Sequence, residues 1–417
     1  MIGALSLRNV GPAEKLDVTF GSRISLLTGD NGLGKSFLLD VAWWALTRRW
    51  PHEVNGAIPA GFKALPRDPS KKATIGFSFD AATGKNSQQS QFDRESQSWK
   101  RQQGRPPKPG LIIYAQADGG FSAWDPARNY WGTDRPPAYV FSSTEVWVGL
   151  RDGEATLCEG LLRDWATWQR ENGSTFELLK SVLRVMSADG ESLSPGALTR
   201  IDLSATVYPT IRVGYGLEVP LVHASAGMRR VMALVYLLVW TWTEHRQASR
   251  LLGEEPAQSV TFLIDEVEAH LHPKWQRRVV PALAELVQQL NPDADVQLII
   301  ATHSPLVMAS LETTFDPAFD RWLDLDLVAG KVVLTERDYV GLGNAERWLL
   351  SEAFDLAATG DPRIEARLAE LERDLAKPDF SQKAAKRWHL ELRGLLGESH
   401  PFWSRWRTFV DLKGWRL

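Results

Sequence analysis

The feature that most constrains this chain is the run Gly29-Asp-Asn-Gly-Leu-Gly-Lys-Ser36, which fits the pattern G-x-x-x-x-G-K-[ST] at every position. It follows a strand-like segment at 23–28 and precedes a helical pattern from Lys35 to about Arg49, the context that the pattern requires. The glycines let backbone N–H groups turn inward around phosphates, and the helix N-terminus adds partial positive charge. The run therefore predicts a triphosphate site formed by Gly29, Asp30, Asn31, Gly32, Leu33, Gly34, Lys35, Ser36 and Phe37.

Two segments further along the chain end in residues suited to triphosphate chemistry. The apolar strand pattern at 260–264 ends in Asp265 and Glu266. The first acid suits magnesium and the second suits the polarisation of an attacking water. His303 follows the strand pattern at 297–302, at the end of a strand where α/β sheets bind ligands. Taken alone, an acidic turn explains the two acids equally well, and a structural histidine explains His303 better.

A third segment offers a second anion site. Ser225 and Gly227 open a long helical pattern that runs from Ala226 to about Gln247. A serine at a helix start and free backbone N–H groups bind anions, although an ordinary N-cap is the simpler interpretation. Arg230, in the first turns of this helix, is interpreted as a surface residue.

In their order and spacing these four elements resemble the ABC-type ATPase superfamily. The run IDEVEAHLHPKWQR at 264–277 is similar to the "DE-x-E-x-HLHP-x-WQ" run of bacterial ATPases related to RecF. Those ATPases include the overcoming-lysogenization-defect (OLD) nucleases and the ATPase subunits of the Septu and PARIS anti-phage systems. The THSP run at 302–305 is similar to theirs as well.

The resemblance implies an α/β fold: an ABC-type ATPase head, with a P-loop mixed sheet and an antiparallel β lobe, an inserted helical subdomain and a small C-terminal helical region. It implies ATP and Mg²⁺ as cofactors and ATP sites shared by two copies of the chain. Glu266 and His303 would be catalytic, and Ser225 and Gly227 would reach the γ-phosphate of the partner's ATP. The magnesium ligands would be Ser36, Asp265 and Gln116.

One departure from the family pattern and one further assignment bear on the site. Ala226 replaces the second glycine of the transporter signature, which is tolerable where the backbone N–H still faces phosphate. Gln116, after the strand pattern at 111–116, is the candidate for the glutamine of the family's Q-loop, with the neighbouring Asp118 as the alternative near magnesium.

The chain is expected to form a head at 1–312 and a strand-plus-helix region at 313–417 that docks a partner. The head would include a β-rich insert at about 50–150 and a helical insert at about 151–200. Strand-like alternation occurs at 2–8 and 73–80, helical spacing at 156–187 and 274–290, and hairpin-like alternation at 200–223. The segment 51–72 reads as loop, and the polar segment 83–109 reads as an exposed hairpin or loop.

Composition excludes several classes of protein. The formal net charge of −3 argues against coating nucleic acid by bulk charge. Cys158 is the only cysteine, so a disulfide framework and a cysteine-rich metal site are excluded, and a reducing cytoplasm is the simplest location. The longest apolar run, Val231 to Trp242, is too short to span a bilayer and is interpreted as a buried helix. Most of the 18 tryptophans are expected to pack inside, with partner-facing anchors as the alternative.

The expected function is that of an ATPase that regulates a separate effector, such as a nuclease, in anti-phage defence. It would act as a homodimer, alone or within a larger assembly. A RecF-like clamp that binds DNA is the alternative, for which the basic residues of 83–109, among them Arg94 and Lys100, are candidate contacts. A self-contained OLD-type nuclease would need more than the pair Asp324 and Asp326, and a transporter motor lacks support in the signature.

Overall fold

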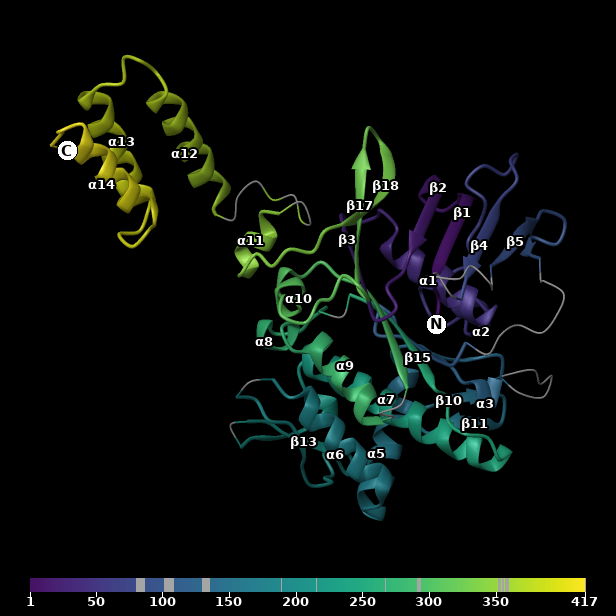
Figure 1. Ribbon diagram of the computed structural model, residues 1–417. Coiled ribbons are helices and arrows are strands. Elements are labelled where there is room, and N and C mark those ends of the chain that lie inside the picture. The colour runs from purple at the N-terminus through teal and green to yellow at the C-terminus, as the bar shows by residue number, and fades with distance from the viewer. Residues whose placement is uncertain are drawn as a thin grey trace. The chain divides into compact units, whose positions relative to one another are not determined.

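The computed structural model describes the chain except for residues 80–86, 101–108, 130–135, 189, 215, 267, 291–293, 352–353, 355, 357–359 and 417, and for the side chains of 287–289. The chain forms two compact units, Met1–Trp348 and Leu349–Leu417 (Figure 1). Among the described helices, none is long and apolar enough to cross a membrane.

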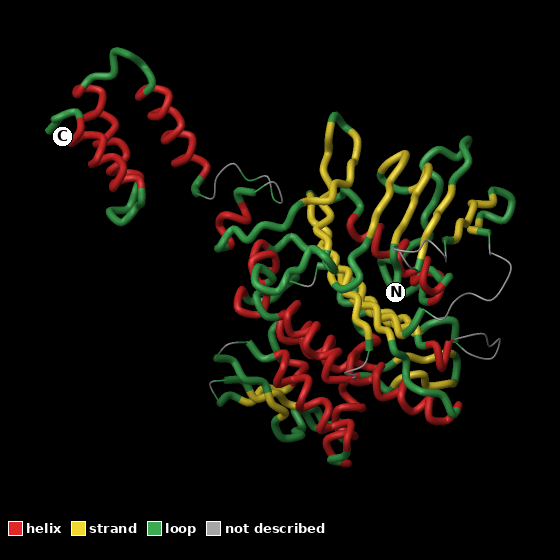
Figure 2. Tube along the Cα trace, viewed as in Figure 1, coloured by secondary structure: helices red, strands yellow, loops and turns green. Residues whose placement is uncertain are grey.

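The first unit is built on an eight-stranded mixed sheet in the order β18-β17-β3-β16-β15-β7-β8-β9 (Figure 2). Its middle strands, β17, β3, β16, β15 and β7, run parallel, and the edge strands join antiparallel. Parallel strands covered on both faces need continuous apolar runs, which VTFLI and QLIIA supply. The strands are β3 (Ile24–Gly29), β7 (Leu111–Ala115), β8 (Phe121–Trp124), β9 (Tyr139–Phe141), β15 (Ser259–Asp265), β16 (Asp295–Ala301), β17 (Arg321–Val328) and β18 (Lys331–Arg337).

An antiparallel sheet in the order β2-β1-β4-β5-β6 forms the expected β lobe. The segment 87–100 contributes the β5–β6 hairpin, whereas the remaining basic positions of the polar segment, 101–108, lie outside the described residues. The fold class predicted from the sequence, a mixed P-loop sheet with an antiparallel lobe, is therefore confirmed. The strands of this lobe are β1 (Ala4–Val10), β2 (Ala13–Thr19), β4 (Thr74–Ser78), β5 (Gln88–Asp93) and β6 (Ser98–Trp99).

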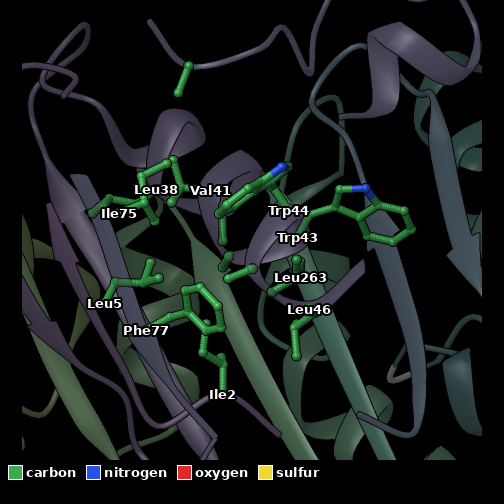
Figure 3. Close-up of a cluster of buried hydrophobic side chains, with 14 of the residues drawn as sticks. Ile2, Leu5, Leu38, Val41, Trp43, Trp44, Leu46, Ile75, Phe77 and Leu263 are labelled. Atoms are coloured by element: carbon green, nitrogen blue, oxygen red, sulfur yellow. The ribbon is translucent and has the colours of Figure 1, made fainter. Parts of the chain in front are cut away.

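Helix α1 (Lys35–Thr47) lies between the two sheets and is apolar on nearly all sides. Its buried side chains, including Trp43 and Trp44, form one core cluster with the antiparallel lobe and the central sheet (Figure 3). Trp44 stacks on Trp50 with ring centroids 5.4 Å apart. Because α1 is held from both sides, the phosphate loop at its N-terminus has a rigid support. Most of the described tryptophans are buried, so the prediction that they pack inside the protein is confirmed for them.

The opposite side of the first unit is helical, with α5 (Leu161–Glu171), α6 (Ser174–Met186), α7 (Ala226–Leu252) and α9 (Val279–Leu290). The apolar run of α7 is a buried helix, as predicted. The helical interpretation of 156–187 is wrong at its start, where Ala155–Cys158 forms β11 and pairs with β10. It also missed a break at Asn172, whose left-handed φ of 48° ends α5 before α6 begins.

The remaining elements of this unit are short. The alternation at 200–223 yields a hairpin of only β13 and β14, and the segment 51–72, predicted as loop, begins with the one-turn helix α2. These elements are α2 (Pro51–Val54), α3 (Pro126–Asn129), α4 (Glu145–Val148), β10 (Leu150–Asp152), β11 (Ala155–Cys158), β12 (Ser194–Pro195), β13 (Thr210–Arg212), β14 (Glu218–Pro220), the 3-10 turn η1 (Leu221–His223), α8 (Pro273–Gln276), α10 (Pro305–Ser310) and α11 (Ala345–Leu349).

The first compact unit extends past residue 312, where we expected the head to end. Strand β17 pairs in parallel with β3, and its partner β18 closes the sheet, so residues 321–337 are part of the central sheet. The second unit contains α12 (Pro362–Leu375), α13 (Gln382–Leu395) and α14 (Phe402–Leu412). Trp388, Trp403 and Trp406 lie at the centre of its own small apolar core.

Candidate functional site

The phosphate-binding loop joins β3 to α1 in a conformation that only glycine adopts easily. Gly29 has φ 121°, and a Cβ there would lie 2.0 Å from the carbonyl oxygen of Leu325 on the neighbouring strand β17. Gly34, with φ 105°, is the N-cap of α1 and offers no side chain to its N–H groups. The start of α1 is thereby left as a positively polarised end of the kind that binds anions. The side chains of Leu33 and Phe37 pack inward, so these two residues offer the loop only their backbone.

Lys35 is buried beside this loop. Its ammonium donates to the carbonyl oxygens of Gly29 at 2.7 Å and Asp30 at 2.8 Å. Burial lowers the pKa of Lys35, and the nearby carboxylates of Asp265 and Glu266 oppose that shift. The ammonium is thus held at the loop by weak backbone acceptors that a phosphate can replace.

Asp265 ends β15, which lies one strand away from β3. The parallel strands bring their carboxyl ends to one edge of the sheet, and there Ser36 lies beside the Asp265 carboxylate. Burial raises the pKa of Asp265 to about 6, and the neighbouring Ser36 side chain and the charge of Lys35 oppose that shift. A hydroxyl and a carboxylate side by side are the hard oxygen ligands that Mg²⁺ prefers, so these two residues fit a magnesium site.

Glu266 follows directly with a left-handed φ of 48°. A residue with a Cβ held in that region costs about 1–3 kcal/mol and persists only where its surroundings enforce it. Here the Glu266 N–H donates to the carbonyl of Ala301, at the end of β16, at 3.0 Å. The strained residue is therefore fixed between two strand ends beside the loop.

His303 lies at the same edge, half-buried. Burial lowers its pKa, as does the positive charge of Lys35, while Glu266 and Asp30 oppose the shift. The imidazole is therefore favoured in its neutral form, with a ring nitrogen free to accept a hydrogen bond. The His303 backbone N–H donates to the carboxylate of Glu268, which is buried.

Two acids in this region were not predicted. Glu268 fixes the backbone of His303, and the run D-E-x-E could have indicated it. Asp40 lies one turn after Ser36 on α1 and accepts from the hydroxyl of Tyr114 at 3.0 Å. Burial raises the pKa of Asp40 to about 7, and the charge on Asp265 adds to the shift. Nothing in the sequence around Asp40 distinguishes it from an ordinary helix surface residue.

The start of α7 has a different position. Ser225 is exposed and is the N-cap, its hydroxyl accepting from the Met228 N–H at 3.3 Å. Gly227 approaches the turn after Asp265 so closely that a Cβ would lie 2.4 Å from the carbonyl oxygen of His270. No hydrogen bond or ion pair recorded for the described residues joins Ser225 or Gly227 to the loop at 29–37 of the same chain.

Gln116 lies at the end of β7, and its side chain is 1% exposed. Both its amide oxygen and its amide nitrogen are without a hydrogen-bond partner among the described residues. The amide lines a cavity of about 570 Å³ whose wall is mainly apolar and includes Phe121, Trp147 and Leu237. The loop at 29–37 does not line this cavity. Asp118, the alternative, is exposed and accepts from the Gly120 N–H at 2.9 Å.

Asp324, one of the two acids considered for nuclease chemistry, has a structural environment. Asp324 is 2% exposed, accepts from the Thr28 hydroxyl at 2.7 Å and pairs with Arg337 at 3.1 Å. It is therefore a buried polar contact between β17 and β3, next to Gly29. Within the described parts of the chain, no group of three or more His, Cys, Asp or Glu side chains could hold a metal ion.

Comparison with known proteins agrees with this geometry. Residues 24–309 match the family model described as "AAA domain, putative AbiEii toxin, Type IV TA system". The chain belongs to this family. The matched region begins in β3 and ends in α10, so it contains the phosphate loop, both strand-end acids and His303. These are the residues from which ATP binding and hydrolysis were predicted.

Two curated relatives are named as ATPases of retrons. The chain is 32% identical to the "Retron Vc95 probable ATPase" of Vibrio cholerae serotype O1 biovar El Tor over 102 residues, which is 23% of this chain and 17% of the relative. It is 28% identical to the "Retron Ec83 probable ATPase" of Escherichia coli over 151 residues, 36% of this chain and 24% of the relative. The matches thus span about a quarter or less of each relative's length.

Solved heads of SMC proteins are also similar. The SMC head bound to the C-winged helix domain of ScpA aligns with a TM-score of 0.44 at 15% identity, over 80% of this chain and 98% of that chain. The SMC head domain from Thermotoga maritima aligns with a TM-score of 0.39 at 16% identity, over 81% and 99%.

Proposed function

We propose that this ATPase binds ATP with Mg²⁺ between two copies of the chain and uses hydrolysis to regulate a separate effector in anti-phage defence, in the cytoplasm. The observation that carries the proposal is the position of Ser36 next to the Asp265 carboxylate, with the buried ammonium of Lys35 close to both. These three groups are the ones that a magnesium-bound triphosphate needs in one place.

The proposed roles follow from the chemistry of each side chain. Lys35 would leave the carbonyls of Gly29 and Asp30 to bind the phosphates, and Ser36 and Asp265 would hold the magnesium. When bound, magnesium would neutralise charge on the phosphate oxygens. Glu266 would accept a hydrogen bond from the attacking water and orient it. Neutral His303, with its lowered pKa, would form a hydrogen bond to the attacking water or to the γ-phosphate.

Shared sites are supported by the start of α7. Ser225 is exposed at the N-terminus of a 27-residue helix, whose dipole favours an anion. Among the described residues neither Ser225 nor Gly227 is hydrogen-bonded to the loop of its own chain, so a second copy related by a two-fold axis would place each α7 start against the other copy's loop. The backbone N–H groups at this helix start would then reach the γ-phosphate held by the partner.

An effector role is supported by three lines of argument. The sequence resembles ATPase subunits of anti-phage systems, and two relatives carry names of retron ATPases. The unit at 349–417 adds a helical module with its own core, outside the region that matches the family model. On α13 of this module Lys383, Lys386 and Arg393 are exposed, which suits docking to an acidic surface of an effector protein.

Complementation between two inactive variants tests the shared sites. Lys35→Ala removes the phosphate-binding ammonium, and Ser225→Arg blocks the start of α7. We expect each variant alone to be inactive in steady-state ATP hydrolysis. A mixed dimer combines the intact loop of Ser225→Arg with the intact α7 start of Lys35→Ala, so an equimolar mixture should recover about a quarter of wild-type activity. A mixture that stays inactive, although it forms dimers with ATP, would count against shared sites.

A DNA titration separates the effector role from the RecF-like alternative. The assay measures binding of a labelled duplex with ATP and magnesium at two salt concentrations. We expect no salt-sensitive binding if the ATPase acts on a protein effector. Binding that weakens steeply with salt, and that is reduced by Arg94→Glu with Lys100→Glu in the exposed β5–β6 hairpin, would favour the clamp.

A further inference from the structure

Arg230 of α7 departs from the surface role expected of it. It is half-buried, whereas the adjacent Arg229 is exposed. Its guanidinium donates to the carbonyl oxygen of Ala117 at 2.9 Å and to that of Gln116 at 3.2 Å. These two residues form the turn that follows β7, so Arg230 joins the start of α7 to the end of a strand in the central sheet.

The same guanidinium reaches the end of β15. It donates to the carbonyl oxygens of Asp265 and Glu266, both at 3.2 Å. The planar guanidinium carries five N–H donors in a fixed fork, which lets one side chain serve several acceptors from two segments. Burial lowers the pKa of Arg230, and the surrounding acids, led by Asp265 and Glu266, oppose the shift.

These bonds act on a residue of the site whose backbone is strained. Glu266 has φ 48°, a value that a residue with a Cβ seldom adopts. Its N–H is bonded to Ala301, and its carbonyl accepts from Arg230 and from the Ala269 N–H at 2.9 Å. Both the N–H and the carbonyl of Glu266 are therefore hydrogen-bonded, and Arg230 supplies the bond that comes from helix α7.

We propose that Arg230 is a positioning residue for ATP hydrolysis. It holds the backbone of Glu266 in the left-handed conformation that directs the carboxylate to the attacking water, and it acts through Glu266 without touching the nucleotide. By also binding the carbonyls of Gln116 and Ala117, it fixes the β7 turn and the acidic strand end to the helix that starts at Ser225. This inference rests on the proposed role of Glu266.

The test compares full-length variants in steady-state hydrolysis, ATP binding and ATP-dependent dimerisation. Arg230→Met keeps the length of the side chain and removes every donor. Arg230→Lys keeps the charge, but its single ammonium cannot span two carbonyl pairs. Arg246→Met is the matched control, because Arg246 is an exposed residue of the same helix.

We expect Arg230→Met to lower kcat about 100-fold, the loss typical of a catalytic group displaced by about 1 Å. Its affinity for ATP should stay within about twofold, since the lost contact acts only on the chemical step. The variant should accumulate the ATP-bound dimer, as a hydrolysis-deficient protein does, and a merely structural defect would not produce that result. The kcat of Arg230→Lys should lie between those of wild type and Arg230→Met, and Arg246→Met should behave as wild type.

Three outcomes would overturn the inference. A wild-type kcat in Arg230→Met would rule out the positioning role. A change in KM without a change in kcat would rule it out as well. If Arg230→Met fails to fold, Arg230→Lys decides, and the inference fails if that variant keeps wild-type kcat. Failure of the proposed function is separate, because it would appear as wild-type hydrolysis in Glu266→Gln whatever the Arg230 variants do.

Discussion

Ser36 lies beside the carboxylate of Asp265, although the two residues come from opposite halves of the chain. The contact exists because β3 and β15 flank β16 in a parallel arrangement, so that the loop after one strand meets the acid at the end of the other. It joins the phosphate-binding part of the site to the acidic part before any nucleotide is bound.

Lys35→Ala should abolish detectable ATP binding. The ammonium lies at the loop and would make charge-assisted hydrogen bonds to the phosphates, each worth about 1.5–3 kcal/mol. Equilibrium binding of a fluorescent ATP analogue measures the effect. Lys71→Ala, which changes an exposed lysine of the same unit, is the control and should bind as wild type does. An unchanged affinity of Lys35→Ala for the ATP analogue would show that Lys35 does not contribute to nucleotide binding.

Gly227→Ala should destabilise the first unit. The new methyl carbon would lie 2.4 Å from the carbonyl oxygen of His270, so the start of α7 or the turn must move. We expect urea unfolding to lose about 1–3 kcal/mol, the usual cost of overpacking. Gly56→Ala is the matched control, because nothing lies within 4 Å of a Cβ there, and its unfolding should change by less than about 0.5 kcal/mol. Equal stability of the two variants would contradict this packing.

Asp164→Asn should stabilise the protein more at high pH than at low pH. Burial raises the pKa of Asp164 to about 6, although the Tyr236 hydroxyl donates to it at 2.6 Å. Because the folded pKa lies above the unfolded value of 3.8, the wild type loses stability as pH rises from about 4 to about 6. Asparagine keeps an acceptor for Tyr236 and cannot ionise.

Urea unfolding of wild type and Asp164→Asn at pH 4.5 and pH 8 measures this effect. The stability of the variant relative to wild type should increase by about 1–2 kcal/mol between the two values. Glu171→Gln, on an exposed position of the same helix, should show no such increase. A pH-independent difference would mean that Asp164 is not the group that titrates in this range.

How much of the site could be predicted depended on whether the signal was local. The run from Gly29 to Ser36, and the apolar strands that end in Asp265 and before His303, are continuous in sequence, so periodicity and spacing located them. Strand β17 was harder, because LDLDLV alternates like a surface strand. In the structure Asp324 is buried, and its carboxylate is paired with Thr28 and Arg337, two residues that no sequence pattern links to it.

The contacts of Arg230 could not be predicted for a related reason. They join three segments that only the folded sheet brings together, and all four acceptors are backbone carbonyls, which carry no sequence information because every residue has one. The break at Asn172 was missed because the apolar spacing continues across it, while a left-handed backbone at asparagine is only a weak preference.

The central claim is that ATP is held between two copies of the chain and hydrolysed with the help of Glu266. The most direct measurement is the solution mass of Glu266→Gln by light scattering, with magnesium and with or without ATP. The account predicts a monomer of 46.7 kDa without ATP and a stable dimer of twice that mass with it, because the phosphate contacts persist while the water is no longer polarised. A mass that stays at 46.7 kDa with saturating ATP, or wild-type hydrolysis by this variant, would contradict the account.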